Sequence, residues 1–200
     1  MIAAVLLAAG QSSRMGQHKL LLPLLGKPLV LHTVQSALAS EVDETLVVVG
    51  YRAEAVREAL AGQPVRIVEN PDYAQGQSTS LRAGVAALAP ETEAVVILLG
   101  DQPLLTAGLL NALMAAWKRT ASPIVAPVYG GQRGNPVLFS RALFQELLAV
   151  SGDQGGREVI QRHAGESILV QMEDPAAALD VDTWQEYQAL LARLEAGLER

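Results

Sequence analysis

Short apolar runs alternate with helical segments along the first 120 residues, and this alternation constrains the fold more than any other feature. Four runs are continuously apolar or rich in β-branched residues and predict strands: Ile2–Leu7, Thr45–Val49, Val65–Val68 and Ala94–Leu99. Start and stop signals predict helices at Pro28–Ala39, at Ala53–Leu60, from a Ser78 cap to about Leu88, and from a Thr106 cap to about Lys118. Apolar strands separated by helices indicate βαβ units, in which a parallel sheet is covered on both faces.

The second half of the chain is less regular. Two apolar runs, Pro123–Val128 and Pro136–Phe139, flank a Gly-rich turn or hairpin. Helices are predicted at Arg141–Ala149 and Gly155–His163, and short strands at Ser167–Met172 and Leu179–Asp182. A terminal helix capped by Thr183 follows. No repeat or linker interrupts the pattern. We therefore expect one domain over residues 1–200, an α/β fold with three α/β/α layers and a mostly parallel, Rossmann-like sheet.

Composition excludes several classes of function. The chain contains no Cys, so a thiolate nucleophile and a Cys-ligated metal or iron–sulfur site are excluded. The 15 basic and 21 acidic residues give a net charge of −6, which disfavours a large surface for nucleic acid or an anionic membrane. The apolar run Ile2–Ala9 is too short to span a membrane, and no basic stretch precedes it as in a signal peptide. We expect a cytoplasmic protein, with a monomer as the simplest assembly.

The segments that follow the predicted strands are the expected place for a ligand. In open α/β sheets, ligands bind beyond the carboxyl ends of the strands. Gly10, Gly50, Asn70 and Asp101 each follow a strand. A carboxylate such as Asp101 at the end of the most apolar strand suits Mg²⁺ bound against phosphate oxygens, although a helix cap or turn would also explain it.

The loop after the first strand is the sharpest motif. It reads Leu7-Ala8-Ala9-Gly10-Gln11-Ser12-Ser13-Arg14-Met15-Gly16-Gln17-His18-Lys19. Small residues let successive backbone N–H groups approach an anion, and Arg14 and Lys19 add two cations, a combination that suits a triphosphate. The alternative is a flexible surface loop with solvated cations. The loop matches neither the dinucleotide fingerprint G-x-G-x-x-G nor the P-loop pattern.

The same loop resembles the signature L-A-A-G-x-S-x-R-M-G-x-x-K of the molybdenum cofactor nucleotidylyltransferases, with each fixed position filled. Further matching segments follow in order: Asn70-Pro71, Gly76–Leu81 with Gly84, Gly100–Pro103, Arg133–Pro136, Gly152–Gly155 and Leu179–Thr183. The resemblance covers nearly the whole chain. It is strongest to the cytidylyltransferase branch, because Ala9 stands where the guanylyltransferase branch usually carries Gly. The fold implied is that of the nucleotide-diphospho-sugar transferases.

The resemblance implies that CMP is transferred from CTP to the terminal phosphate of molybdopterin, with release of pyrophosphate. It implies Arg14, Lys19 and Asp101 as catalytic residues, and Asp101 with Asp182 as ligands of Mg²⁺. Asp182 precedes Thr183 and would alternatively be an ordinary helix N-terminal feature. In a strand at Leu179–Asp182, Asp180 and Asp182 would share one face.

Nucleotide-binding residues follow from the same resemblance. The nucleotide-binding set comprises Leu7, Ala8, Ala9, Gly10, Ser12, Arg14, Lys19, Asn70, Gly76, Ser78, Ser80 and Asp101. The acceptor-binding set comprises Gln102, Arg133, Gly134, Asn135 and Asp153. It follows from chemistry, because a pterin with a phosphate tail offers hydrogen-bonding edges and negative charge that suit Asn and Arg, although an ordinary Gly-rich hairpin turn would also explain Arg133–Asn135. Residues up to about 105 would bind the nucleotide and the rest the acceptor.

Three alternatives stay open at this point. The same chemistry could use GTP, ATP or another phosphorylated acceptor. The protein could instead be a chaperone that carries the molybdenum cofactor to a molybdoenzyme, which would be its protein partner. A dinucleotide-binding oxidoreductase is the most distant alternative, because the glycine fingerprint is absent.

Overall fold

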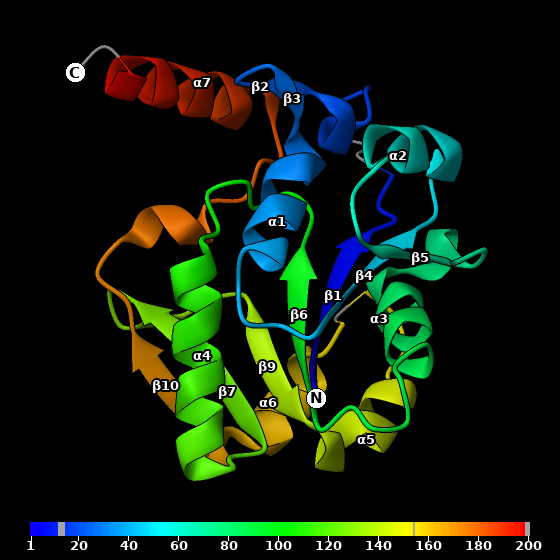
Figure 1. Cartoon of the computed structure of the whole chain (residues 1–200), viewed down its shortest axis with the longest axis vertical. Coiled ribbons are helices and arrows are strands. Elements are labelled where there is room, and N and C mark those ends of the chain that lie inside the picture. Colours follow the sequence, from blue (N-terminus) through cyan, green and yellow to red (C-terminus); the bar gives the residue numbers. More distant parts are fainter. Residues whose placement is uncertain (12–14, 154, 199–200) are drawn as a thin grey trace.

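A computed structural model describes residues 1–11, 15–153 and 155–198, and it forms an α/β fold around one large sheet (Figure 1). The strands are β1 (Ile2–Ala8), β2 (Pro23–Leu24), β3 (Lys27–Pro28), β4 (Glu44–Val49), β5 (Arg66–Glu69), β6 (Ala94–Leu99), β7 (Ile124–Tyr129), β8 (Gln132–Arg133), β9 (Val137–Ser140) and β10 (Ile168–Gln171). The α-helices are α1 (Leu29–Leu38), α2 (Ala53–Ala59), α3 (Gln77–Ala86), α4 (Ala107–Thr120), α5 (Phe144–Leu148), α6 (Arg157–Arg162) and α7 (Trp184–Leu198).

The main sheet is mostly parallel, which confirms the prediction. Its strand order is β10-β7-β9-β6-β1-β4-β5, with β8 paired to β7. Strands β6, β1, β4 and β5 run parallel, and β10 runs parallel to β7. Strand β9 lies between β6 and β7 and is antiparallel to both. The hairpin predicted around the Gly-rich turn is therefore confirmed, and its second strand separates β7 from the parallel half.

Two apolar clusters, one on each face of the sheet, make the three layers. Successive residues of β1 alternate between them: Ala4 and Leu6 belong to one cluster, and Ala3 and Val5 to the other. The first cluster includes side chains from α1, α2, α4 and α7, and the second includes side chains from α3, α5 and α6. Helices α1 and α4 lie in front of the sheet in Figure 1. The period of two along a strand sends neighbouring side chains to opposite faces, so continuously apolar strands require both layers.

Two local predictions were wrong. Helix α3 begins at Gln77 after Gly76, so Ser78 lies in its first turn, buried, rather than at its cap. The segment 179–182 is irregular rather than a strand, and the backbone N–H of Val181 donates to the carbonyl of Asp101 at 3.0 Å. The predicted caps at Thr106 and Thr183 are confirmed, because each side-chain oxygen accepts a backbone N–H three residues later.

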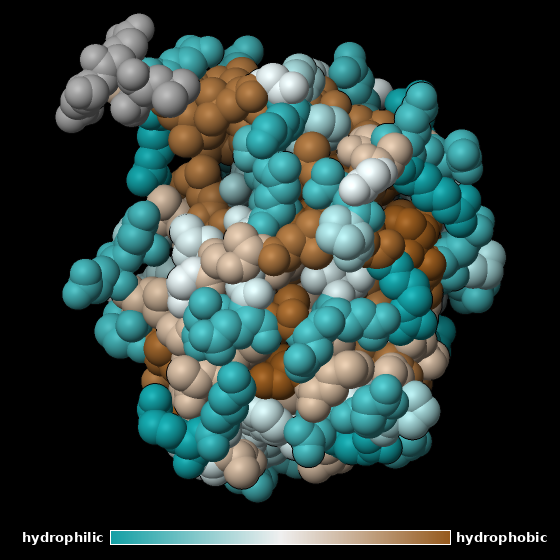
Figure 2. Space-filling model, viewed as in Figure 1, coloured by the Kyte–Doolittle hydropathy of each residue, from teal (hydrophilic) through white to brown (hydrophobic). Residues whose placement is uncertain are grey.

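Few large apolar side chains are exposed on the surface. The large exposed ones are Leu25, Leu169, Leu179 and Trp184. Figure 2 shows hydrophilic side chains over much of one face, with apolar atoms gathered beside α7. Among the described residues, no helix has both the length and the apolar character needed to cross a bilayer.

His163 offers a pH-dependent test of the packing of the helices behind the sheet. Its ring nitrogens lie 2.9 Å from Glu146 in α5 and 3.1 Å from Glu166, and these hydrogen bonds raise its pKa. A raised pKa means that the stabilisation is complete below the ordinary value of about 6.5 and is lost as pH rises through the folded-state value. The melting temperature of His163→Gln should therefore fall below wild type by up to about 2–4 °C at pH 5.5, and by less at pH 8.5. An equal deficit at both values would contradict the charged pairing.

Candidate active site

A cavity of about 490 Å³ lies beyond the carboxyl ends of β1 and β6, where the topology predicts a ligand. Its walls come from the loop after β1, the loop between β5 and α3, and the segment after β6. The described lining residues are Leu7, Ala9, Gly10, Gln11, Lys19, Leu20, Tyr73, Ala74, Gly76, Gln77, Ser80, Leu99, Gly100, Asp101, Asp153 and Asp182. Segments far apart in the sequence thus meet at one edge of the sheet.

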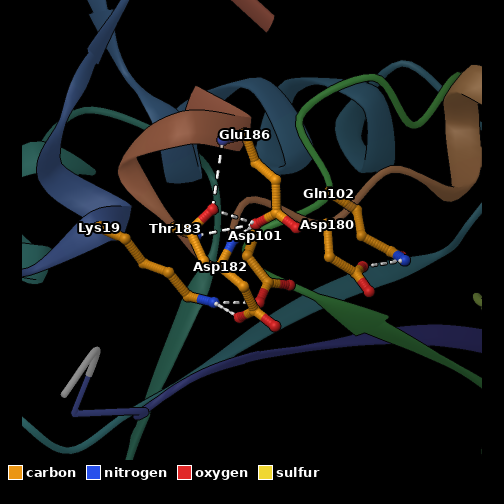
Figure 3. A network of polar contacts seen from close by, with 7 residues as sticks. All are labelled: Lys19, Asp101, Gln102, Asp180, Asp182, Thr183 and Glu186. Carbon is orange, nitrogen blue, oxygen red and sulfur yellow. Dashed lines mark hydrogen bonds and ion pairs between the residues drawn. The ribbon is translucent and has the colours of Figure 1, made fainter. Parts of the chain in front are cut away.

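Lys19 is the centre of a charged cluster in this cavity (Figure 3). Its ammonium donates to Asp101 Oδ2 at 2.6 Å and to Asp182 Oδ1 at 2.7 Å. The three side chains arrive from the turn after the first loop, from the end of β6 and from the segment before α7. Burial alone lowers the pKa of Lys19, but attraction and hydrogen bonds from the two carboxylates outweigh it, so its pKa is raised. Lys19 is therefore fully charged at neutral pH.

Asp101 has an oxygen that the described residues do not satisfy. Its Oδ2 binds Lys19, whereas its Oδ1 is buried and has no hydrogen-bond partner in the described part of the chain. A buried carboxylate oxygen without a partner is costly, and a hard divalent cation is the ligand type that carboxylates prefer. The described residues contain no group of three or more His, Cys, Asp or Glu able to hold a metal. Two carboxylates therefore suit an ion that completes its shell with water and phosphate oxygens.

Glu186 orients Asp182 from the first turn of α7. One of its carboxylate oxygens accepts the backbone N–H groups of Asp182 and Thr183 at 2.9 and 2.8 Å, and also the Thr183 hydroxyl at 3.0 Å. These bonds, first that from Asp182, lower the pKa of Glu186. Thr183 and Glu186 form a reciprocal capping box, which the T-x-x-E spacing indicates and our sequence analysis missed. The box holds the Asp182 backbone at the start of the helix.

The buried side chain of Gln102 is paired with Asp180, an exposed residue beside this cluster. Gln102 Nε2 donates to Asp180 Oδ1 at 2.6 Å, and Gln102 is 2% exposed. Burial first, and then the negative charge of Asp101, raise the pKa of Asp180 to about 6. Gln102 lines neither this cavity nor the neighbouring one described below, so the structure places it behind the charged cluster rather than on an acceptor surface.

Asn70 shapes the loop between β5 and α3. It is 3% exposed, and its amide donates to Thr79 Oγ1 at 2.9 Å and to Ser80 Oγ at 3.0 Å. Its carbonyl oxygen accepts the N–H of Asp72 at 3.0 Å. Asn70 thus links the loop to α3 through buried hydrogen bonds, while Ser80 lines the cavity.

The predicted nucleotide-binding residues fall into three groups. Seven line the cavity: Leu7, Ala9, Gly10, Lys19, Gly76, Ser80 and Asp101. Ala8, Asn70 and Ser78 are buried beside it without lining it. Ser12 and Arg14 lie outside the described residues. Sequence reasoning missed Tyr73 and Gln77, which also line the cavity and carry no distinctive pattern.

A second cavity of about 350 Å³ adjoins the first, and the two share Leu7, Gln77, Leu99 and Asp153. Four predicted acceptor residues line it: Arg133, Gly134, Asn135 and Asp153. Arg157 lines it too and was not predicted. Burial first, and then the positive charge of Arg157, lower the pKa of Arg133. Two guanidinium groups near one another, beside apolar side chains that include Leu81 and Phe139, suit an anionic group on a bound ligand.

Comparisons with known proteins show what this chain is similar to. The family model described as the MobA-like NTP transferase domain matches residues 4–167. The molybdenum cofactor cytidylyltransferase of Escherichia coli K12 is 31% identical, and the match covers 91% of each chain. The nicotine blue oxidoreductase of Paenarthrobacter nicotinovorans is 32% identical, over 95% of this chain and 96% of that protein. The crystal structure of Rv0371C from Mycobacterium tuberculosis H37Rv in complex with manganese is 32% identical, covers 96% of this chain and 98% of that chain, and has a TM-score of 0.83.

Proposed function

This chain belongs to the MobA-like NTP transferase family, and from that premise we propose that it transfers CMP from CTP to the terminal phosphate of molybdopterin. The observation that carries the proposal is the ammonium of Lys19 between Asp101 and Asp182 at the mouth of the cavity beyond β1 and β6. A fixed cation beside two carboxylates suits a bound triphosphate with a divalent cation. The relative described in complex with manganese supports a divalent ion in this fold.

The reaction needs positioning and charge neutralisation rather than a protein nucleophile. An ionised oxygen of the acceptor phosphate attacks the α-phosphorus of CTP, the bond from that phosphorus to the bridging oxygen breaks, and pyrophosphate leaves with the electron pair. Lys19 would neutralise the charge that grows on the phosphate oxygens. Asp101 and Asp182 would hold Mg²⁺, which supplies further positive charge when bound. Arg14 would add a second cation to the triphosphate.

The two cavities would divide the substrates. The backbone of Leu7–Gly10, together with Gly76 and Ser80, would hold the nucleotide, with Asn70 and Ser78 supporting that wall. Arg133, Asn135 and Asp153 would hold the acceptor, and Arg157 would hold it too, because it lines the same cavity. Residues before about 105 would then bind mainly the nucleotide and later residues mainly the acceptor, within one domain. Asp182 is an exception, because this residue of the second half lies in the nucleotide cavity.

The substrate pair is the finer part of the proposal. Relatives of similar identity are named for different activities, one a cytidylyltransferase and one an oxidoreductase. Hydride transfer requires neither the paired carboxylates nor the cation between them, so the charged cluster favours the transferase. GTP or ATP as the donor, and a carrier of the molybdenum cofactor, are the outcomes that a test must separate.

Nucleotide-dependent thermal stabilisation tests the donor. CTP with Mg²⁺ should raise the melting temperature by about 5–10 °C at 100 times its dissociation constant, because that occupancy adds about 2.7 kcal/mol. GTP, ATP and Mg²⁺-free CTP should give smaller shifts. Release of pyrophosphate from CTP on addition of molybdopterin would complete the assignment. A larger shift with GTP or ATP would overturn the donor, and no shift with any nucleotide would favour the carrier.

A further inference from the structure

Three aromatic rings from three separate loops form a row beside the cavity, here called the ring row: His18, Tyr51 and Tyr73. The rings of His18 and Tyr51 are stacked, with centroids 5.5 Å apart and an angle of 9° between their planes. The rings of Tyr51 and Tyr73 are tilted, with centroids 6.3 Å apart. The row joins the loop after β1, the turn after β4 and the loop after β5, and Tyr73 lines the cavity.

His18 is anchored to the turn after β4 by a directed hydrogen bond. Its Nε2 lies 3.1 Å from the backbone carbonyl oxygen of Tyr51, and His18 is 3% exposed. A carbonyl only accepts, so Nε2 carries the hydrogen and Nδ1 is unprotonated. That Nδ1 is buried and has no partner among the described residues. Burial lowers the pKa of His18, which keeps the ring in this neutral form.

The same residue sets the backbone that carries Lys19. The carbonyl of His18 accepts the N–H of Leu21 at 3.0 Å, and this bond closes the short 3₁₀ turn Lys19–Leu21. Tyr51 is tied to the first loop a second time, because its N–H donates to the carbonyl of Ala9 at 3.2 Å. A Cβ on Gly50 would lie 2.6 Å from Tyr73 and 2.8 Å from Ala9, so the turn is packed tightly between both loops.

We propose that His18 is a positioning residue for triphosphate binding. Its ring fastens the turn that carries Lys19 to Tyr51, and thereby sets where the ammonium meets the phosphates. The inference rests on the proposed function, because it takes Lys19 to bind the triphosphate of the nucleotide. No other described side chain next to Lys19 in the chain has such an anchor, since Gln17 is exposed and Leu20 packs in the core.

The test compares binding of CTP with binding of CMP by calorimetry. His18→Leu fills the buried space with an apolar side chain that cannot donate to the carbonyl of Tyr51. This variant should weaken CTP binding about tenfold or more, because the displaced Lys19 ammonium loses or strains its hydrogen bond to the phosphates. It should leave CMP binding within about twofold. His18→Gln restores a donor at similar reach and should recover most of the affinity for CTP.

His32 supplies the matched control. Its Nε2 also bonds a backbone carbonyl, that of Leu24 at 2.8 Å, but it does not carry Lys19. His32→Leu should lower stability while leaving the ratio of CTP to CMP affinity unchanged. If His18→Leu fails to fold, Tyr51→Leu removes the stacked ring and keeps the carbonyl, so it should show a smaller loss that is still selective for CTP.

The outcomes separate the inference from the proposed function. Equal weakening of CTP and CMP by His18→Leu, or none, would overturn the positioning role while leaving nucleotide transfer intact. If GTP or ATP proves to be the donor, the same comparison of triphosphate with monophosphate applies to that nucleotide. A wild-type protein that binds no nucleoside triphosphate would overturn both.

Discussion

Replacing Asp101 with Asn is expected to lower the rate of pyrophosphate release by about 10³-fold or more while the protein stays folded. The Asn side chain has the same size and can still accept the hydrogen bond that Asp101 Oδ2 receives from Lys19 at 2.6 Å. What it removes is the negative charge beside the unpartnered Oδ1. Lys19, Asp101 and Asp182 together carry a net charge of −1, which the substitution makes zero. A divalent cation is then no longer attracted to the site, and a Lewis acid contributes several kcal/mol to such transition states.

The measurement pairs turnover with direct binding of Mn²⁺ by electron paramagnetic resonance. Asp101→Asn should lose both. Asp180→Asn is the matched control, because it removes a carboxylate from the same cluster that bonds Gln102 rather than Lys19. It should keep turnover within about threefold. Full activity in Asp101→Asn would remove this residue from the metal site, and an equal loss in Asp180→Asn would extend the site to Asp180.

Much of the fold could be predicted because its strands are buried on both faces. The predicted limits of Ala94–Leu99 match β6 at both ends, since each residue of that strand must be apolar in a sheet covered on two sides. The same rule placed Gly10 and Asp101 at the ligand edge, and both line the cavity. Spacing alone could not bring Asp182 there, 163 residues from Lys19. That placement came from the resemblance.

The failures have physical causes that a linear pattern does not show. Apolar and acidic residues alternate over Leu179–Asp182 as in a strand, but the backbone N–H of Val181 donates to the carbonyl of Asp101. In the part of the chain that the structure describes, no strand pairs with this segment. Tyr73 and Arg157 matter through neighbours from other loops, which only the tertiary structure brings together. Gln102 follows Asp101 directly in the sequence, yet its side chain is buried against Asp180. Adjacency to a site residue therefore did not place it in the acceptor cavity.

Lys19 is expected to be nearly as important as Asp101, with an additional signature. Lys19→Met keeps the length and apolar stem of the side chain but removes the ammonium from between the two carboxylates. Turnover should fall by roughly 10²–10³-fold, the usual cost of removing one pre-positioned group that stabilises the transition state. Lys19→Arg should not restore it, because a planar fork does not replace a compact charge 2.6 and 2.7 Å from two carboxylates.

The additional signature is the affinity for a divalent cation without nucleotide. In the wild type, a cation that binds Asp101 and Asp182 must compete with the Lys19 ammonium, which already bonds both. In Lys19→Met the two carboxylates carry −2 without that counter-ion, so Mn²⁺ should bind at least about tenfold more tightly than in the wild type. The variant would then bind metal better and turn over far more slowly. A loss of turnover below about threefold would show that Lys19 does not stabilise the transition state. Unchanged Mn²⁺ affinity would show that the ion binds elsewhere. Both effects together would mean that the Lys19 ammonium lowers the affinity for the free ion until the triphosphate draws the ammonium away from the carboxylates. Cation and nucleotide would then favour each other's binding by the same factor.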